Sequence, residues 1–289
     1  MRITIFGATG LLGKALVQEW KDDEITGLSS KDADLRNAGQ VAQAIKLSRP
    51  DWIVLAAAYT DVDGCEKNSQ LAFEVNFRGA VNVAKAAKEF SSRLLFLSTD
   101  YVFDGAKTTP YETTDHMAPL SVYGRSKAQA EAALAELLPE CCIVRTSWLF
   151  GRGGRCFPDT ILKLAAEREE ISVVDDQRGS PTYAPDLAQA IVQLCRKRAN
   201  GIVHATNRGD CTWFQFARHL LANAGLATVI RPIRSDAMIR PAKRPSYSVL
   251  SPTSLERFGI MLPTWQNGVE RYLKEIRSGQ QISVPDATA

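Results

Sequence analysis

A tyrosine and a lysine four positions apart have a spacing that suggests chemistry. Tyr123 and Lys127 stand in "YGRSK", and on a helix this spacing puts both side chains on one face, one turn apart. A neighbouring ammonium stabilises a phenolate and lowers the phenol pKa from its ordinary value of about 10. The pair can therefore exchange a proton with a substrate, although the same spacing alone is also common on helix surfaces.

Polar side chains follow the apolar run "RLLFL" in the segment "STDYVFDG", residues 98–105. We expect the run to be a buried strand that brings these groups to an edge of a sheet. Thr99 is the candidate that would hydrogen-bond a reacting oxygen and hold it against Tyr123. Ser98 is the weaker candidate, because neighbouring strand residues point to opposite faces.

A glycine-rich turn near the N-terminus predicts a dinucleotide site. The segment "GATGLLG" follows the strand-like "RITIF" and places Gly7, Gly10 and Gly13 at three-residue intervals, with Leu11 and Leu12 between them. Glycine permits a tight turn and lets backbone N–H groups approach a pyrophosphate, which the N-terminus of the next helix also favours. Out of context the pattern is weak, but between a first strand and a first helix it outweighs a plain strand-to-helix turn.

The end of the second predicted strand indicates which cofactor is bound. NAD-binding folds usually carry an acid there for the ribose 2′-hydroxyl, whereas this chain has Ser29, Ser30 and Lys31. We therefore predict NADPH, with NADH possible. Further residues that we expect beside the dinucleotide are Asp34, Leu35, Ala56, Ala57, Ala58 and Thr60.

The elements that must position these residues alternate along the first half of the chain. Strand-like runs are "RITIF", "EITGL", "WIVLAAA", "RLLFL" and "CCIVR", with amphipathic stretches between them. Such alternation implies parallel βαβ crossovers and a sheet covered on both faces. We predict an α/β protein with a Rossmann-type doubly wound parallel sheet and a smaller, mostly C-terminal substrate-binding lobe. The NADP(H)-binding domain would take residues 1–150, completed by about 180–206, and the lobe residues 151–179 and 207–289.

Composition excludes several classes of function. The net charge of +3 over 289 residues is too small to indicate a nucleic-acid surface. No apolar stretch approaches the roughly 20 residues of a membrane span, and we expect a cytoplasmic protein without a membrane partner. The six cysteines form no C-x-x-C pair, so we expect buried thiols and predict no metal ligands. The segment "RPIRSDAMIRPAKRPS" is basic and could meet an anionic ligand, or be a solvated loop.

The chain resembles the dTDP-4-dehydrorhamnose reductases of the extended short-chain dehydrogenase/reductase family. The motifs that carry the resemblance span about residues 7–251: "AAAYTDVDGCE", "STDYVFDG", "PLSVYGRSKAQAE", "VRTSWLFG", "VVDDQRGSPTYAPDLA" and "RPSYSVLS". The resemblance implies that Thr99, Tyr123 and Lys127 are catalytic. It also implies a sugar-nucleotide pocket with Tyr101, Phe103, Trp148, Gln177 and Arg244, although core packing is nearly as good an explanation for Phe103 and Trp148.

The implied activity is NADPH-dependent reduction of the C4 ketone of dTDP-4-dehydro-6-deoxy-L-mannose to dTDP-L-rhamnose, with a dTDP-sugar as partner and a monomer or homodimer as the acting form. Some relatives are described with Mg²⁺ at a dimer contact, which we leave open. Reductases of other nucleotide-bound 4-keto-6-deoxysugars could share every motif. A nucleotide-sugar epimerase or dehydratase is disfavoured, because the related dehydratases carry an acid where this chain has Tyr101. A non-enzymatic regulatory subunit, like the β subunit of methionine adenosyltransferase, is the other alternative, since fold alone does not decide function.

Overall fold

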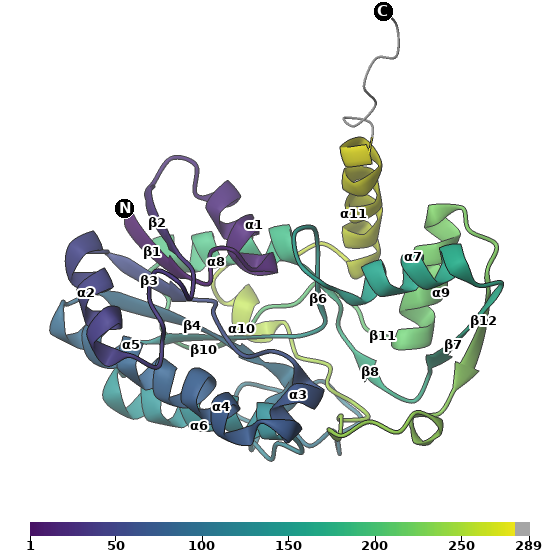
Figure 1. The fold of residues 1–289 in the computed structure, drawn as a ribbon, viewed down its shortest axis with the longest axis horizontal. Coiled ribbons are helices and arrows are strands. Elements are labelled where there is room, and N and C mark those ends of the chain that lie inside the picture. Colours follow the sequence, from purple (N-terminus) through teal and green to yellow (C-terminus); the bar gives the residue numbers. More distant parts are fainter. Residues whose placement is uncertain (281–289) are drawn as a thin grey trace, which may run out of the picture.

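Six parallel strands form the central sheet, in the order β2-β1-β3-β4-β5-β10 (Figure 1). A computed structural model describes residues 1–280; the last nine residues of the predicted lobe, 281–289, lie outside the described residues. The strands are β1 (Arg2–Phe6), β2 (Glu24–Leu28), β3 (Trp52–Leu55), β4 (Arg93–Thr99), β5 (Cys142–Thr146) and β10 (Gly201–His204). The five predicted strands are confirmed, and β10 comes from the later segment that we assigned to the same sheet. The order reverses between β1 and β3, where ligands bind in such sheets.

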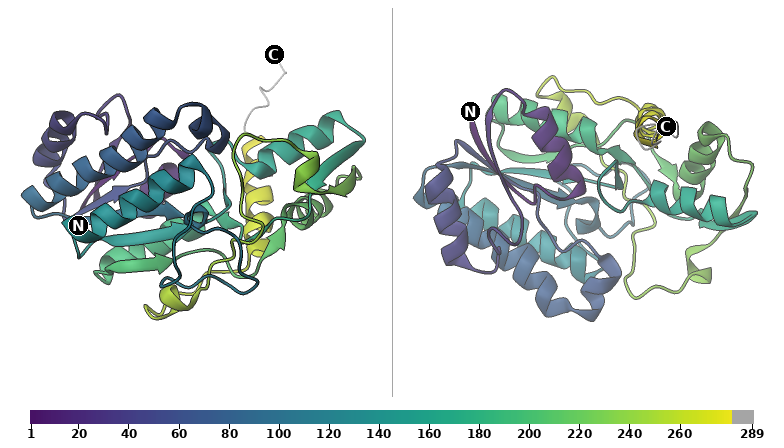
Figure 2. Two further views of the ribbon diagram at one scale, coloured as in Figure 1. Left: turned by 90° about the horizontal axis from the view of Figure 1, so that it is seen from below. Right: turned by 45° about the horizontal axis from the view of Figure 1, so that its top comes forward.

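Helices cover both faces of the sheet, as Figure 1 and Figure 2 show. On one face α1 (Leu11–Glu19) and α8 (Ala184–Arg196) pack together; on the other lie α2 (Ala38–Ser48), α5 (Gly79–Glu89) and α6 (Val122–Leu137). The strands separate two cores, because successive side chains alternate between faces. Ile3 and Ile5 join the α1–α8 core, whereas Phe6 joins the core under α2 and α5.

Between β3 and α5 the chain makes a series of short helical segments that cover the start of α6. They are α3 (Val62–Lys67), α4 (Ser69–Phe73) and a π-helical turn over Glu74–Arg78. Asn76 lies in that turn, and its amide donates a 3.0 Å hydrogen bond to the hydroxyl of Ser126 in α6. The segment therefore holds the helix that carries Tyr123 and Lys127.

A second, smaller group of elements lies to the right in Figure 1 and has its own aromatic core. Phe150, Phe216 and Tyr272 are its largest fully buried side chains besides Tyr183. The elements are β6 (Leu149–Phe150), α7 (Phe157–Glu167), β7 (Glu170–Val174), β8 (Arg178–Gly179), β9 (Thr182–Tyr183), β11 (Cys211–Thr212), α9 (Trp213–Ala224), β12 (Val229–Ile233), a 3-10 turn at Ser235–Ala237 and α11 (Trp265–Gln280).

One segment differs from the predicted division of the chain. Helix α10 (Thr253–Glu256) contacts β10, and Leu255, Ile260 and Leu262 pack into the α1–α8 core of the sheet, although their numbers fall in the predicted lobe. The chain therefore returns from the lobe to the sheet before α11. Within residues 1–280 no helix combines the length and the apolar character needed to cross a bilayer.

Candidate active site

The predicted site residues gather where the parallel strands end. Gly7 follows β1, Ser29 follows β2, Ala56 follows β3 and Thr99 ends β4. Because the strands are parallel, all four lie at one edge of the sheet, and the N-terminus of α6 meets that edge beside β4. The sheet thus brings together residues that are about 90 positions apart in the chain.

Ser121 is the N-cap residue that sets the start of helix α6. The Ser121 hydroxyl accepts a 3.1 Å hydrogen bond from the Gly124 N–H, which satisfies a first-turn donor and sets the start of the helix. Tyr123 then falls in the first turn and Lys127 one turn later on the same face. The ring of Tyr123 packs edge-on against Tyr101, with centroids 6.1 Å apart and planes 77° apart.

Thr99 and Ser98 point in different directions, as expected for neighbours on a strand. The Thr99 hydroxyl donates to Asp100 Oδ1 at 3.0 Å and accepts from the Tyr101 N–H at 3.2 Å. It also faces the hydroxyl of Tyr123, where it acts to lower the pKa of that phenol. Ser98 instead donates to the carboxylate of Glu131, beneath the site. Thr99 and not Ser98 therefore faces the tyrosine.

The pKa values of the Tyr123–Lys127 pair are set mainly by burial. Burial raises the pKa of Tyr123, and Thr99 opposes that shift. The sequence argument expected a lowered phenol pKa; the direction is reversed because the phenolate is desolvated and the Asp100 charge disfavours it further. Burial also lowers the pKa of Lys127 to about 7. Tyr123 is consequently a phenol at neutral pH, ready to donate a proton.

Asp100 is a buried acid that the sequence analysis did not single out. Its side chain is 2% exposed, and burial raises its pKa to about 7. One oxygen accepts from Thr99, while the other has no hydrogen-bond partner among the described residues. Asp100 thus fixes the direction of the Thr99 hydroxyl, and no pattern in the sequence distinguished it from Asp104, the other acid in "STDYVFDG".

The glycine turn after β1 has the shape needed for a pyrophosphate. Gly7 has φ +88°, and a Cβ there would lie 2.7 Å from the Ala57 nitrogen; a Cβ on Gly13 would lie 2.0 Å from the Gly7 carbonyl oxygen. Helix α1 is preceded by Gly10 and has no side-chain cap, so its first N–H groups are free to meet an anion. Leu11 is half-buried beside this turn, and Leu12 packs into the sheet core.

The loop after β2 holds the residues predicted to recognise the adenosine end of the cofactor. The Ser29 hydroxyl and N–H donate to Asp32 at 2.6 and 2.8 Å, while Ser30 and Lys31 are exposed. Asp34 is paired with Arg36 at 2.6 Å. Of the remaining predicted cofactor residues, Leu35 is buried in the core, Ala56, Ala57 and Ala58 are half-buried and Thr60 is exposed.

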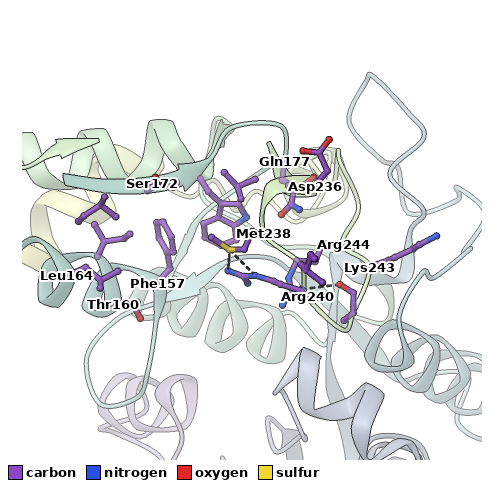
Figure 3. A pocket seen from close by; sticks show the side chains of 18 residues that line it. Phe157, Thr160, Leu164, Ser172, Gln177, Asp236, Met238, Arg240, Lys243 and Arg244 are labelled. Carbon is purple, nitrogen blue, oxygen red and sulfur yellow. Dashed lines mark hydrogen bonds between the residues drawn. The ribbon is translucent and has the colours of Figure 1, made fainter. Parts of the chain in front are cut away.

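A cavity of about 650 Å³ lies between the lobe and the segment 235–244, and Gln177 and Arg244 line it as predicted (Figure 3). One end is apolar, with Phe157, Leu164 and Trp213; the other is basic, with Arg240, Lys243 and Arg244. The charges of Arg240 and Arg244 act on the Tyr101 hydroxyl and lower its pKa, against the larger effect of burial. The basic end of the cavity therefore adjoins the Tyr101–Tyr123 pair.

Arg244 also forms an ion pair that links the two parts of the molecule. Its guanidinium donates to both carboxylate oxygens of Asp63 in α3, at 3.1 and 2.8 Å, and the arginine holds the pKa of that carboxyl below its usual value. The partners are 181 positions apart, so no local pattern indicated the pair. Asp63 stands within the quoted motif "AAAYTDVDGCE" but had no assigned role.

Three predicted pocket residues do not line the cavity: Tyr101, which lies beside its basic end, and Phe103 and Trp148. Phe103 is fully buried and stacks on Tyr111 with ring centroids 4.1 Å apart, so its position in the core does not support a substrate contact. Trp148 stacks on Trp213 at 3.4 Å, with ring planes 5° apart. Since Trp213 is the one that lines the cavity, Trp148 lies behind it as a support.

Comparison with known proteins identifies the family to which this chain belongs. The model of the family described as the RmlD substrate binding domain matches residues 1–278. The chain belongs to this family. A dTDP-4-dehydrorhamnose reductase of Sinorhizobium fredii is 38% identical over 94% of this chain and 96% of its own. A dTDP-4-keto-6-deoxy-D-glucose reductase of Streptomyces niveus is 37% identical over 90% of this chain and 91% of its own.

A solved member of this family shares the fold closely. The dTDP-4-dehydrorhamnose reductase of Bacillus anthracis, crystallised in complex with NADP, is 39% identical and superposes with a TM-score of 0.92 over 95% of this chain and 99% of its own.

Among the described residues, no group of three or more His, Cys, Asp or Glu side chains has the arrangement of a metal site.

Proposed function

We propose that this protein is an NADPH-dependent oxidoreductase that reduces the C4 ketone of dTDP-4-dehydro-6-deoxy-L-mannose to give dTDP-L-rhamnose. The observation that carries the proposal is that Thr99 faces Tyr123 at the sheet edge where the glycine turn lies, next to Tyr101, on which the arginines of the cavity's basic end act. The NADP complex of the Bacillus anthracis relative supports the choice of cofactor.

The cofactor is held by residues along the edge of the sheet. Gly7, Gly10 and Gly13 with the start of α1 receive the pyrophosphate. Ser30 and Lys31, which are exposed, receive the 2′-phosphate, and Lys127 holds the nicotinamide ribose. When bound, NADPH supplies a hydride to C4 of the sugar.

The reacting oxygen is held by Tyr123 and Thr99. Hydride addition to the ketone places a negative charge on the C4 oxygen, and the Tyr123 phenol donates its proton to that oxygen. The Lys127 ammonium offsets the charge of the resulting phenolate. Thr99 would hydrogen-bond the same oxygen and hold it against Tyr123.

The cavity accepts the dTDP part of the substrate. We place the thymine at the apolar end near Phe157 and Trp213, and the diphosphate at the basic end beside Arg240 and Arg244, because guanidinium groups bind phosphates in two-point contacts. Gln177 contributes a polar group along the wall. The sugar then lies beside Tyr101, with its C4 ketone directed toward Tyr123.

The proposal includes the predicted division into an NADP(H)-binding domain and a substrate lobe, with residues 253–262 added to the sheet side. It also includes a cytoplasmic location and a monomer or homodimer as the acting form. Mg²⁺ has no assigned role in it.

A second candidate is reduction of another dTDP-bound 4-keto-6-deoxysugar, which the name of the Streptomyces niveus relative favours. A dehydratase is disfavoured because Tyr101, with a pKa raised by burial, is not an acid or base for loss of water. An epimerase that retains NAD is disfavoured because Ser29, Ser30 and Lys31 stand where NAD-binding folds usually carry an acid. A regulatory subunit is disfavoured because it would need neither the Thr99 that faces Tyr123 nor the Lys127 one turn further along α6.

The test is NADPH oxidation with defined keto-sugar nucleotides. We expect the purified protein to consume NADPH with the dTDP-4-keto sugar produced by an upstream 3,5-epimerase, and to yield dTDP-L-rhamnose. Consumption only with the unepimerised dTDP-4-keto-6-deoxy-D-glucose would support the second candidate. No NADPH oxidation with either sugar, under conditions in which both ligands bind, would support the regulatory subunit.

A further inference from the structure

A buried acid and a buried arginine lie beneath the Tyr123–Lys127 pair, and the chemistry proposed above does not use them. Glu131 follows Lys127 by one more turn of α6, and Arg145 lies on β5, at the register position beside Ser98 of β4. Both charged side chains are 1% exposed. Charged groups are almost never buried to this degree unless they are paired.

The pair is held in a single arrangement by several hydrogen bonds. Arg145 Nε donates to Glu131 Oε1 at 3.0 Å and to Oε2 at 3.1 Å, and its Nη2 donates to Oε2 at 2.6 Å. The Ser98 hydroxyl donates to Oε1 as well. The Glu131 carboxylate is thus held in one position by its ion pair with Arg145.

Lys127 experiences the charge of the Glu131 carboxylate. Tyr123, Lys127 and Glu131 follow one another at intervals of four residues, which places all three on one face of α6. Burial lowers the pKa of Lys127, and the Glu131 charge opposes this shift. The ammonium also lies 4.0 Å from the centre of the Phe96 ring, a contact that favours the charged form.

The other titratable groups around this cluster are two that are neutral at neutral pH, His204 and Cys141, and one that is partly charged, Asp100. Burial and the charge of Arg145 lower the pKa of His204 to about 3, so this histidine of β10 is neutral. Burial raises the pKa of Cys141, whose thiol is also neutral. Asp100, with a pKa raised to about 7, faces Thr99 and Tyr123. Arg145 itself is compensated by Glu131.

We propose that Glu131 is a positioning residue for Lys127: clamped by Arg145 and Ser98, its carboxylate keeps the lysine charged and aligned on the face of α6 that carries Tyr123. Because the Glu131 oxygens already accept from Arg145 and Ser98, the N–H groups of Lys127 remain available for the cofactor ribose. This inference rests on the proposed function for the role of Lys127, but the charge state of Lys127 is measured without any substrate.

The test is an NMR titration of the whole protein, labelled with ¹³C at lysine Cε, with the Lys127 resonance assigned by Lys127→Arg. We expect Glu131→Gln to lower the Lys127 pKa by about one unit or more, since a buried charge one turn away is removed. Glu131→Asp keeps the charge and should restore most of the pKa. In keto-sugar reduction, the decrease in kcat/KM at high pH should move to lower pH in Glu131→Gln and return in Glu131→Asp.

A matched control is Asp186→Asn. Asp186 is a second buried acid paired with an arginine, Arg271, at 2.5 Å, and it lies in α8 on the opposite face of the sheet from α6. Its loss should leave the Lys127 pKa unchanged. If Glu131→Gln does not fold, the double variant Glu131→Leu/Arg145→Met replaces the pair by apolar groups, which proteins often tolerate, and should also lower the Lys127 pKa.

A Lys127 pKa that stays within experimental error in the Glu131 variants would overturn the inference and leave the pair as a structural brace. This outcome is separate from failure of the proposed function. A protein that reduces no keto sugar but shows the Lys127 shift would retain the positioning role and lose only the assigned reaction.

Discussion

The pKa of Tyr123 is shifted in the direction opposite to the one suggested by its spacing to Lys127 alone. Burial raises the phenol pKa and lowers that of the lysine, to about 7. A neutral phenol beside a lysine is suited to donating a proton to an oxygen that gains charge during hydride transfer. Thr99, whose hydroxyl donates to Asp100 and faces Tyr123, is placed to hydrogen-bond the same oxygen.

At this scale we predict the effects of removing each hydroxyl. Tyr123→Phe keeps the ring but removes the proton donor, so kcat should fall by about 10² to 10⁴, with little change in NADPH affinity. Thr99→Val should cost less, because it removes one hydrogen bond. Two residues that act on one oxygen should be non-additive in the double variant. Steady-state kinetics of the four proteins measures this, and losses that simply add would contradict the assignment.

Among the elements, the loop after β2 and the segment 235–244 carry the polar and basic side chains that the proposed function assigns to NADPH and to the sugar nucleotide. The first presents Ser30 and Lys31 at its exposed tip while Ser29 is tied to Asp32. The second carries Arg240 and Arg244, which line the basic end of the cavity (Figure 3). Each element therefore supports a separate prediction about one ligand.

For the loop after β2, Ser30→Asp should discriminate between the two nicotinamide cofactors. The new carboxylate would repel a 2′-phosphate but could accept from a ribose 2′-hydroxyl. We expect the KM for NADPH to rise much more than the KM for NADH. Ser30→Ala is the control, since it removes the hydroxyl without adding charge. Equal changes in both KM values would place the 2′-phosphate elsewhere.

For the segment 235–244, Arg244→Ala should weaken dTDP binding by about 1.5 to 3 kcal/mol, the worth of a hydrogen bond to a charged group. Asp63→Asn removes the charge that competes for Arg244, so dTDP affinity should hold or rise. Arg234→Ala, an exposed arginine paired only with Asp236 nearby, is the matched control and should have no effect. Calorimetry with dTDP decides, and an unchanged Arg244→Ala would mean that Arg244 only closes the ion pair with Asp63.

In the whole molecule, the proposed function assigns the cofactor to the sheet and the sugar nucleotide to the lobe, and the chain runs between the two parts several times. The glycine turn lies on the sheet, whereas the apolar end of the cavity belongs to the lobe. Residues 253–262 return to the sheet core after the lobe segment. The two ligand sites meet only near Tyr101 and Tyr123, where Arg244 is joined to Asp63.

This arrangement predicts that the two binding sites can be damaged separately. A Cβ at position 13 would lie 2.0 Å from the Gly7 carbonyl oxygen, so Gly13→Ala should distort the turn and weaken NADPH binding by tenfold or more, equivalent to about 1.4 kcal/mol. Binding of dTDP should be unchanged. Gly39→Ala, in helix α2 and without a backbone clash, is the control. Loss of both ligands in Gly13→Ala would show that the two parts do not bind independently.

The sequence by itself determined those features that are local or periodic. The alternation of apolar runs and amphipathic stretches is sufficient to predict the parallel sheet, since each strand must be covered on both faces. The glycine turn and the four-residue spacing of Tyr123 and Lys127 each involve only a few neighbouring positions. The same is true of Thr99 at the end of an apolar strand. Glu131 could have been found by extending the same spacing by one turn.

Only the tertiary structure decided which side chains meet and which are removed from water. Arg244 finds Asp63 across 181 positions, and Arg145 finds Glu131 on another element, because packing and not local pattern brings such partners together. Phe103 went to the core rather than to the cavity, since an aromatic residue after a strand fits either place. The reversed pKa shift of Tyr123 has the same origin: desolvation depends on everything that surrounds a group, and the spacing to one lysine does not contain that information.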